Sequence, residues 1–174
     1  MLKLAMLSTG EEVLHGDIVD TNASWLSGLL FEEGFSLSKR STVGDSHQAL
    51  TEELILLTLN SDVLIVNGGL GPTSDDVTTE VAANVAGVEL ELFPDWLEQM
   101  NAFFATRNQV MPDSNVKQAM LPAGSTFIDN PIGTACGFQC VINECLCYFT
   151  PGVPSEFKRM VVEQIVPDLS LIHI

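Results

Sequence analysis

Basic residues are scarce in this sequence. Lys and Arg together number 7 among 174 residues, against 23 Asp and Glu, so the formal net charge is −16. Such a surface repels nucleic-acid phosphates, and we expect no nucleic-acid partner. Most of the acids need only keep the protein soluble. For an anionic small ligand, which the few bases are too few to neutralise, a divalent cation is the natural bridge.

Long apolar runs are missing as well. No stretch is long enough to cross a bilayer, so the sequence predicts no membrane partner. The apolar start, Met1–Ser8, has one basic residue and leads into Ser-Thr-Gly-Glu-Glu without a small-residue cleavage site. We interpret it as a buried strand and not as a signal peptide, and we expect a cytoplasmic protein. Hydrophobic residues make up 46% of the chain, which is enough for the core of one domain.

Strand-like and helix-like segments alternate along the first two thirds of the chain. This alternation predicts an α/β fold, a three-layer α/β/α sandwich with a mostly parallel sheet. The expected strands are Lys3–Ser8, Ser36–Val43 and Val63–Asn67. The expected helices are Ile18–Glu33, stopped by Gly34; a helix to about Leu59, capped by Asp45 with Gln48 in a capping box; a helix to about Ala86, ended by Gly87; and Asp95–Thr106, after Pro94.

Three loops follow the predicted strands: Thr9–Asp17, Gly44–Ser46 and Asn67–Asp76. All three contain glycine and acidic residues. In parallel sheets, ligands bind beyond the carboxyl ends of the strands, so we expect these loops to form the ligand site together.

The third loop, with the sequence NGGLGPTSDD, fits neither common phosphate-binding pattern. It lacks the Lys of the phosphate loop, and Ser74 stands where the dinucleotide pattern needs glycine or alanine. Its glycines still let the backbone approach a ligand closely, and the following helix offers free N–H groups to an anion. Asp75 and Asp76 then bind a metal beside the phosphate; alternatively, Asp75 caps the helix and Asp76 occupies its first turn.

The last third contains a predicted β-hairpin, with Asn143-Glu144 as a two-residue turn between Cys136–Ile142 and Cys145–Phe149. Strand alternation places all four cysteines on one apolar face. Their spacing is not the Cys-x-x-Cys of structural zinc sites, so we predict buried, reduced thiols. The four are Cys136, Cys140, Cys145 and Cys147.

Taken in order, these motifs resemble the CinA-type competence/damage-inducible proteins, whose N-terminal domain has the molybdopterin-binding, Mog/MoaB-like fold. The resemblance extends to about Leu169. The segments that carry it are Ser8–Leu14 with Gly16, Ile18-Val19 and Thr21-Asn22; Thr42–Asp45; Gly68–Asp76; Asn115 with Lys117–Ala119; Asn130-Pro131 with Gly133–Ala135 and Gly137-Phe138; and Phe149–Phe157.

The resemblance implies metal-dependent hydrolysis of a nucleoside diphosphate derivative, ADP-ribose to AMP and ribose 5-phosphate. Alternatives are adenylyl transfer to a molybdopterin-like ligand, binding of such a ligand, and non-catalytic nucleotide sensing. The expected metal ligands are Asp75 and Asp76, with magnesium as the cation. Glu11 or Asp45 orients the attacking water. The expected contacts to substrate and phosphate are Thr9, Gly10, Gly68, Gly69, Gly71, Thr73, Lys117, Gly133, Thr134, Ser155 and Glu156.

We expect residues 1–169 to form this domain and to fold alone, and a homo-oligomer is also expected. Relatives of this type often continue into a nicotinamide mononucleotide deamidase domain. This chain ends before it, so we expect no such activity here. Residues 170–174 depart from the family pattern and are given no role.

Overall fold

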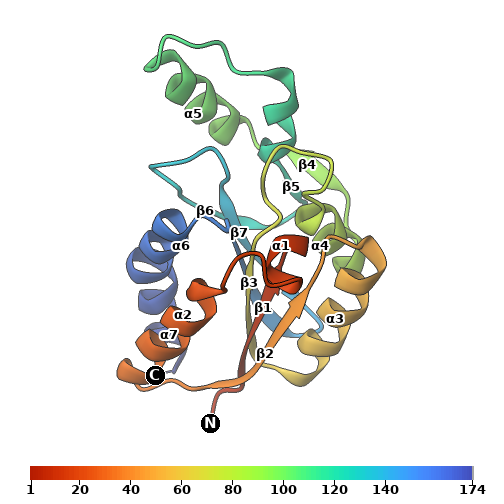
Figure 1. Ribbon diagram of the computed structural model, residues 1–174, viewed down its shortest axis with the longest axis vertical. Helices are drawn as coiled ribbons and strands as arrows, with labels where there is room; N and C mark the ends of the chain where they lie inside the picture. The colour runs from red at the N-terminus through yellow and green to blue at the C-terminus, as the bar shows by residue number, and fades with distance from the viewer. Residues whose placement is uncertain (174) are drawn as a thin grey trace.

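A six-stranded, mostly parallel sheet runs through the centre of the computed structural model, which describes residues 1–173 (Figure 1). Its strand order is β2-β1-β3-β8-β7-β6, with β2, β1, β3 and β8 parallel and β7 antiparallel to its neighbours. The strands are β1 (Leu4–Thr9), β2 (Leu37–Val43), β3 (Val63–Asn67), β6 (Thr126–Ile128), β7 (Gly137–Ile142) and β8 (Cys145–Thr150).

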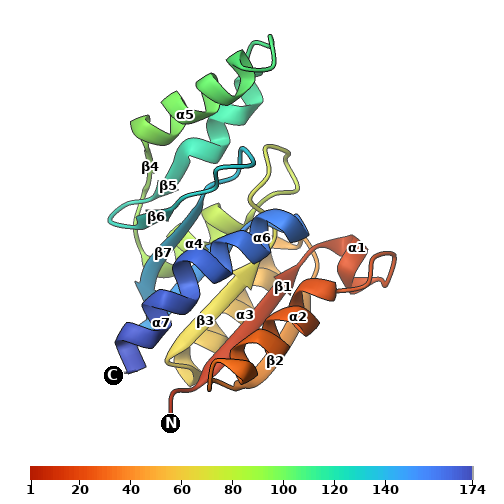
Figure 2. The same cartoon turned by 90° about the vertical axis from the view of Figure 1, so that its left-hand side faces the viewer.

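Helices cover both faces of this sheet, which confirms the predicted three-layer fold (Figures 1 and 2). One layer contains α2 (Thr21–Glu32), α6 (Pro154–Met160), the π-helical turn η2 (Val161–Ile165) and α7 (Val166–His173). The other contains α3 (His47–Asn60) and α4 (Thr78–Ala86). Within residues 1–173, none of the helices combines the length and apolar character that a membrane span requires.

Alternate side chains of each central strand point to opposite faces of the sheet and pack against the two helix layers. Leu4 and Met6 of β1 pack into the core under α2, and Ala5 and Leu7 pack into the core under α3. All six residues of β1 are buried. A strand buried on both faces has a nearly continuous apolar run, here Leu4–Leu7, which is why the N-terminal segment superficially resembles a signal peptide.

A small arm projects beyond the sheet (Figure 2). It consists of α5 (Pro94–Ala105), the 3₁₀ segment η1 (Asp113–Ala119) and an antiparallel strand pair, β4 (Leu90–Leu92) with β5 (Met120–Pro122). Trp96 and Met100 anchor α5 in the core. Pro94 occupies the first turn of α5, as predicted, but the short strands and η1 were not predicted.

The start of the second helix differs from the prediction. The chain after β1 first makes a single turn, α1 (Glu11–Leu14), and α2 begins only at Thr21. Asp20 is the reason, because its side chain accepts a hydrogen bond from the Ala23 N–H at 3.0 Å and caps the helix. Ile18, predicted as the first residue of the helix, is instead in the preceding loop and is 55% exposed.

The predicted cap of α3 was also wrong. Ser46, not Asp45, accepts the hydrogen bond from Ala49 N–H at 3.3 Å. Gln48 bonds to Glu52 along the helix, so the predicted capping box does not form. Asp45 is thereby left in the loop that precedes the helix.

The C-terminal hairpin confirms its predicted turn and pairing, while Cys140 is half-buried and not buried as predicted. Asn143 and Glu144 both have positive φ, at 51° and 64°, as a two-residue hairpin turn requires. Ile142 pairs with Cys145, and Cys140 with Cys147. All four cysteines are free and pack in or against the core cluster under α3 and α4. Ser170–His173 form the end of α7, so most of the predicted tail continues the last helix.

Candidate functional site

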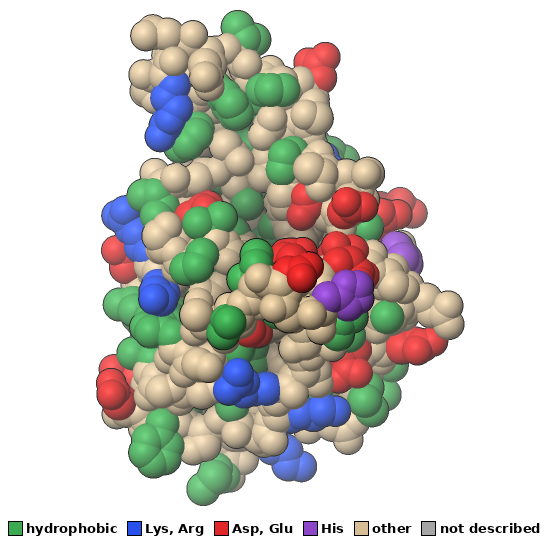
Figure 3. Space-filling view, in the orientation of Figure 1, with side chains coloured by type: hydrophobic (Ala, Val, Ile, Leu, Met, Phe, Trp, Pro, Cys, Tyr) green, Lys and Arg blue, Asp and Glu red, His purple; other side chains and the backbone are tan. Residues whose placement is uncertain are grey.

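A cavity of about 750 Å³ lies at the carboxyl ends of β1, β3 and β8, where the sequence predicted the ligand site. This volume is in the usual range for small-molecule sites, about 300–1,000 Å³. Figure 3 shows acidic side chains gathered near the centre of this face of the molecule. The predicted site residues on its lining are Thr9, Gly10, Asp45, Gly68, Gly69, Gly71, Thr73, Asp75, Asp76, Gly133, Thr134 and Glu156.

Glycine backbone forms the part of the cavity that follows β3. Gly68 and Gly69 have φ of 110° and 73°, a region that side chains disfavour. A Cβ on Gly68 would lie 2.8 Å from the Thr9 carbonyl oxygen, and one on Gly69 would lie 2.0 Å from the Thr78 hydroxyl. The two glycines are therefore required for the close packing of this loop against β1 and α4.

The two aspartates of this loop have different roles in the structure. Asp76 Oδ2 accepts hydrogen bonds from the backbone N–H and the hydroxyl of Thr73, at 3.0 and 2.6 Å. Asp75 makes no such bond among the described contacts and, like Asp76, lines the cavity. Val77 stands at the N-cap of α4 without a side-chain cap, so the interpretation of Asp75 as the helix cap was wrong.

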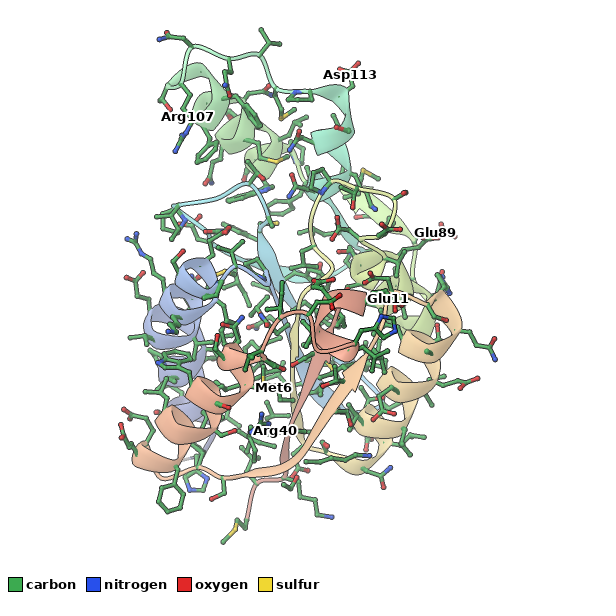
Figure 4. The ribbon with its side chains drawn as sticks, in the orientation of Figure 1. Met6, Glu11, Arg40, Glu89, Arg107 and Asp113 are labelled. Atoms are coloured by element: carbon green, nitrogen blue, oxygen red, sulfur yellow. The ribbon has the colours of Figure 1, made fainter. Side chains whose placement is uncertain are left out.

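A second acidic segment faces this loop across the cavity. Asp45 and Glu11 hold each other through reciprocal bonds: Asp45 N–H donates to Glu11 Oε1 at 2.9 Å, and Glu11 N–H donates to Asp45 Oδ2 at 3.4 Å. Burial raises the pKa of the Asp45 carboxyl, and the negative charges of Glu12, Glu11 and Asp75 raise it further. Asp45 and Glu12 line the cavity, whereas Glu11, whose position Figure 4 labels, does not.

A buried carboxylate lies on the C-terminal side of the cavity. Glu156 is 9% exposed, and its Oε1 accepts a hydrogen bond from Asn130 Nδ2 at 2.6 Å. Gly133 makes room for it, since a Cβ there would lie 1.8 Å from Oε1. The loop is fixed from the arm, because Trp96 Nε1 donates to the Thr134 carbonyl at 3.0 Å.

Three predicted site residues do not line the cavity: Glu11, Lys117 and Ser155. Glu11 positions Asp45, as its hydrogen bonds show. Lys117 Nζ donates to the Thr73 carbonyl at 2.5 Å, so its ammonium group ties η1 to the Thr73 turn. The structure thus gives both residues a positioning contact in place of the predicted direct one.

Sequence reasoning missed a polar network below the cavity. Asn22 Nδ2 donates to Asn67 Oδ1 at 2.9 Å and to the Gly152 carbonyl at 3.0 Å. Asn67 Nδ2 donates in turn to the Pro151 carbonyl at 2.7 Å. This network joins the loops after β1, β3 and β8. Both residues lie within the sequence motifs quoted above, so the motifs could have identified them. They were overlooked because an uncharged amide does not stand out as a candidate catalytic or metal-binding group.

The acidic residues fit a cation shared with a ligand better than a resident metal. Within residues 1–173, no group of three or more Asp, Glu, His and Cys side chains is arranged to enclose a metal ion. Asp75, Asp76 and Asp45 nevertheless line one cavity. Magnesium is commonly held by one or two carboxylates together with substrate phosphates, and this cavity has carboxylates that can serve as those ligands.

These features define an α/β domain with a ligand cavity at the carboxyl edge of its parallel strands. The family model described as a probable molybdopterin binding domain matches residues 5–170, and the chain belongs to that family. The CinA-type resemblance is confirmed by its relatives.

Two of these relatives are a CinA-like protein of Escherichia coli O9:H4 (strain HS) and the NMN amidohydrolase-like protein YfaY of Escherichia coli (strain K12). Each is 56% identical to this chain over 169 residues, which cover 97% of the chain and 42% of the relative. The chain therefore spans less than half the length of these relatives.

Solved structures agree with the assignment. The crystal structure of the protein CinA from Thermoplasma acidophilum is 28% identical, with a TM-score of 0.82, covering 94% of this chain and 97% of that one. The molybdopterin biosynthesis enzyme MoaB from Thermus thermophilus is 19% identical with a TM-score of 0.63, covering 99% and 96%. The second likeness concerns the fold alone.

Proposed function

We propose that this domain hydrolyses the pyrophosphate of a nucleoside diphosphate derivative in the presence of a divalent cation, with ADP-ribose as substrate and AMP and ribose 5-phosphate as products. The observation that carries the proposal is the composition of the cavity. One lining segment is glycine backbone after a strand, which suits phosphate oxygens, and the acidic Asp75, Asp76 and Asp45 lie on the same cavity.

The pyrophosphate lies against the Gly68–Gly71 backbone, with the Thr73 hydroxyl beside it. Asp45 orients a water molecule and accepts its proton as the water oxygen bonds to one phosphorus. The bond from that phosphorus to the bridging oxygen breaks, and the bridging oxygen leaves with the second phosphate. A carboxyl whose pKa is raised by burial is a better proton acceptor than an ordinary Asp.

Asp75 and the free Oδ1 of Asp76 would hold the cation, which supplies charge neutralisation and polarisation of the phosphate when bound. The need for it follows from the net charge of −16. None of the cavity-lining side chains within residues 1–173 is Lys or Arg. An anionic substrate alone would be repelled.

A second candidate is binding of a molybdopterin-like ligand, with or without adenylyl transfer. The match to the family of probable molybdopterin binding domains favours it. A pterin carries a planar ring and a phosphate, so the same cavity would accept it. The two candidates differ in turnover: hydrolysis releases AMP from ADP-ribose without a pterin acceptor.

The direct test is to incubate the purified chain with ADP-ribose and magnesium and to separate the products by chromatography. AMP and ribose 5-phosphate in equal amounts support hydrolysis. Tight ligand binding without products supports a binding module. Nicotinamide mononucleotide is the control substrate, because the proposed site acts on a pyrophosphate and should release no ammonia from a compound that has none.

A further inference from the structure

We propose that Phe103, backed by Arg107, is the stacking platform for the planar base of the ligand. The inference rests on the proposed function for the class of ligand, a purine nucleotide. It gives a function to the arm, which has no part in the proposed hydrolysis of the pyrophosphate.

The two side chains stack on one another at the C-terminal end of α5, with Arg107 just beyond the helix. The Arg107 guanidinium carbon lies 3.6 Å from the centre of the Phe103 ring, and Arg107 Nη1 donates to the Phe103 carbonyl at 3.1 Å. A cation over an aromatic face is attracted by the ring's electron density, so this contact favours the observed orientation of the ring. No carboxylate among residues 1–173 forms an ion pair with Arg107.

Phe103 stands at the boundary of two cavities. It lines the main cavity and also a second one, of about 380 Å³, between α5 and the loop after β6. Gly133 is shared by both linings, and Arg107 lines the second. Figure 4 shows Arg107 on the arm, on the side of the loop between β6 and β7. A ligand with phosphates in the main cavity therefore meets Phe103 where it extends toward the arm.

The chemistry of this platform suits a flat, uncharged ring better than a second phosphate. Stacking on an aromatic side chain is available to every nucleobase, and Arg adds a stacking contribution of its own. The second cavity has apolar lining from Trp96, Met100 and Pro131. Gln99, Thr106 and Asn130 also line it and can bond to the polar edge of a base. The glycine loops and acids then select the phosphate half of the ligand, and the arm selects the base half.

The test is calorimetric titration, with magnesium present, of two probes that differ in the base: AMP and ribose 5-phosphate. Phe103→Ala should weaken AMP binding at least about fivefold, the lower end for one stacked base. Its affinity for ribose 5-phosphate should change less than about twofold, because that probe has no base to stack. Phe103→Tyr keeps the ring and should bind AMP like the unmodified chain.

Phe104→Ala is the matched control. Phe104 neighbours Phe103 on α5, with ring centres 5.9 Å apart, and is also half-buried, but it lines neither cavity. It should leave AMP affinity unchanged. Equal weakening of both probes by Phe103→Ala, unchanged AMP affinity, or AMP binding no tighter than ribose 5-phosphate in the unmodified chain would overturn the inference.

Turnover distinguishes this inference from the proposed function. If the chain makes no AMP from ADP-ribose but Phe103→Ala selectively weakens AMP binding, the proposed hydrolysis is rejected and the stacking role of Phe103 is supported. If ADP-ribose is hydrolysed and Phe103→Ala changes neither KM nor AMP affinity, the stacking role of Phe103 is rejected and the proposed hydrolysis is supported.

Discussion

Oδ2 of Asp76 accepts hydrogen bonds from both the backbone N–H and the hydroxyl of Thr73, at 3.0 and 2.6 Å. The bonds fold the acidic end of the glycine loop into a tight turn, and Lys117 ties that turn to the arm through the Thr73 carbonyl. One carboxylate oxygen is thus used by the fold, and the other remains for a ligand. The same residue can shape the loop and bind a cation.

Asp45 and Glu11 were alternative candidates for orienting the attacking water, and the structure separates them. Asp45→Asn should lower the turnover rate about 10²–10⁴-fold, the usual contribution of a general base. Glu11→Gln retains the oxygen that accepts from Asp45 N–H and should lower the rate less than about tenfold. Steady-state rates of AMP formation decide between them, and the reverse order of effects would reassign the base.

The same Asp45 substitution should stabilise the protein. Because the folded-state pKa is raised, the folded protein binds more protons than the unfolded chain between the unfolded and folded pKa values. Stability therefore falls as pH rises through this window, and the loss persists above it. We expect Asp45→Asn to gain at most about 1 kcal/mol at about pH 7, since Asp45 is only partly buried and solvent screens its charge.

Denaturant unfolding of both proteins from about pH 7 down to about pH 4 measures this difference. The gain should shrink as the pH falls through the window. A gain that does not depend on pH would show that ionisation of the Asp45 carboxyl, which burial and the charges of Glu12, Glu11 and Asp75 disfavour, is not its cause.

Gly133→Ala should disrupt the C-terminal side of the site, because its Cβ would lie 1.8 Å from Glu156 Oε1 and 2.9 Å from Asn130 Nδ2. We expect a loss of about 1–3 kcal/mol in unfolding free energy, as for other overpacked sites. Ligand affinity should fall as well. Gly28→Ala is the control: nothing lies within 4 Å of its Cβ, and this exposed helix position should gain up to about 1 kcal/mol. Equal stability of the two variants would contradict the packing argument.

Cys136, Cys145 and Cys147 are buried and Cys140 is half-buried, so we expect all four thiols to react slowly in the folded protein. Burial raises the pKa of the Cys136 thiol to about 12 and that of Cys140 to about 11, so little thiolate is present at about pH 8. Titration with a thiol reagent should be slow for the folded protein and should reach four thiols after denaturation. Fewer than four thiols, or stoichiometric zinc, would contradict this assignment.

Much of the fold could be predicted because the strands carry their own signals. Val63–Asn67 is an apolar run buried on both faces, and its predicted bounds are those observed. The start of α2 could not be predicted from periodicity, since Ile18 and Val19 extend the apolar pattern of the helix while the Asp20 cap sets its true beginning. Short β4 and β5 pair only with each other and have three residues each, too few to show a pattern.

The site was predictable where its residues share a loop, and less so where they meet only in the fold. Gly68 to Asp76 lie together in sequence and on the cavity. Glu11 and Glu12 are adjacent, and only the turn of α1 determines which one faces the cavity. Phe103 reaches it from an arm far along the chain. The homo-oligomer, the cytoplasmic location and the absence of a nucleic-acid partner stay predictions.

Asp76 is the residue on which the proposed site depends most. Asn at this position has nearly the same shape and can still accept the hydrogen bonds from Thr73, so the turn should persist while one unit of charge is lost. The decisive measurement is the rate of AMP formation from ADP-ribose across a magnesium titration, for the unmodified chain and for folded Asp76→Asn. We expect turnover only with the cation, and a loss of two or more orders of magnitude in the variant, roughly 3 kcal/mol or more of transition-state stabilisation. Near-normal hydrolysis by Asp76→Asn with unchanged magnesium dependence would contradict the proposed site.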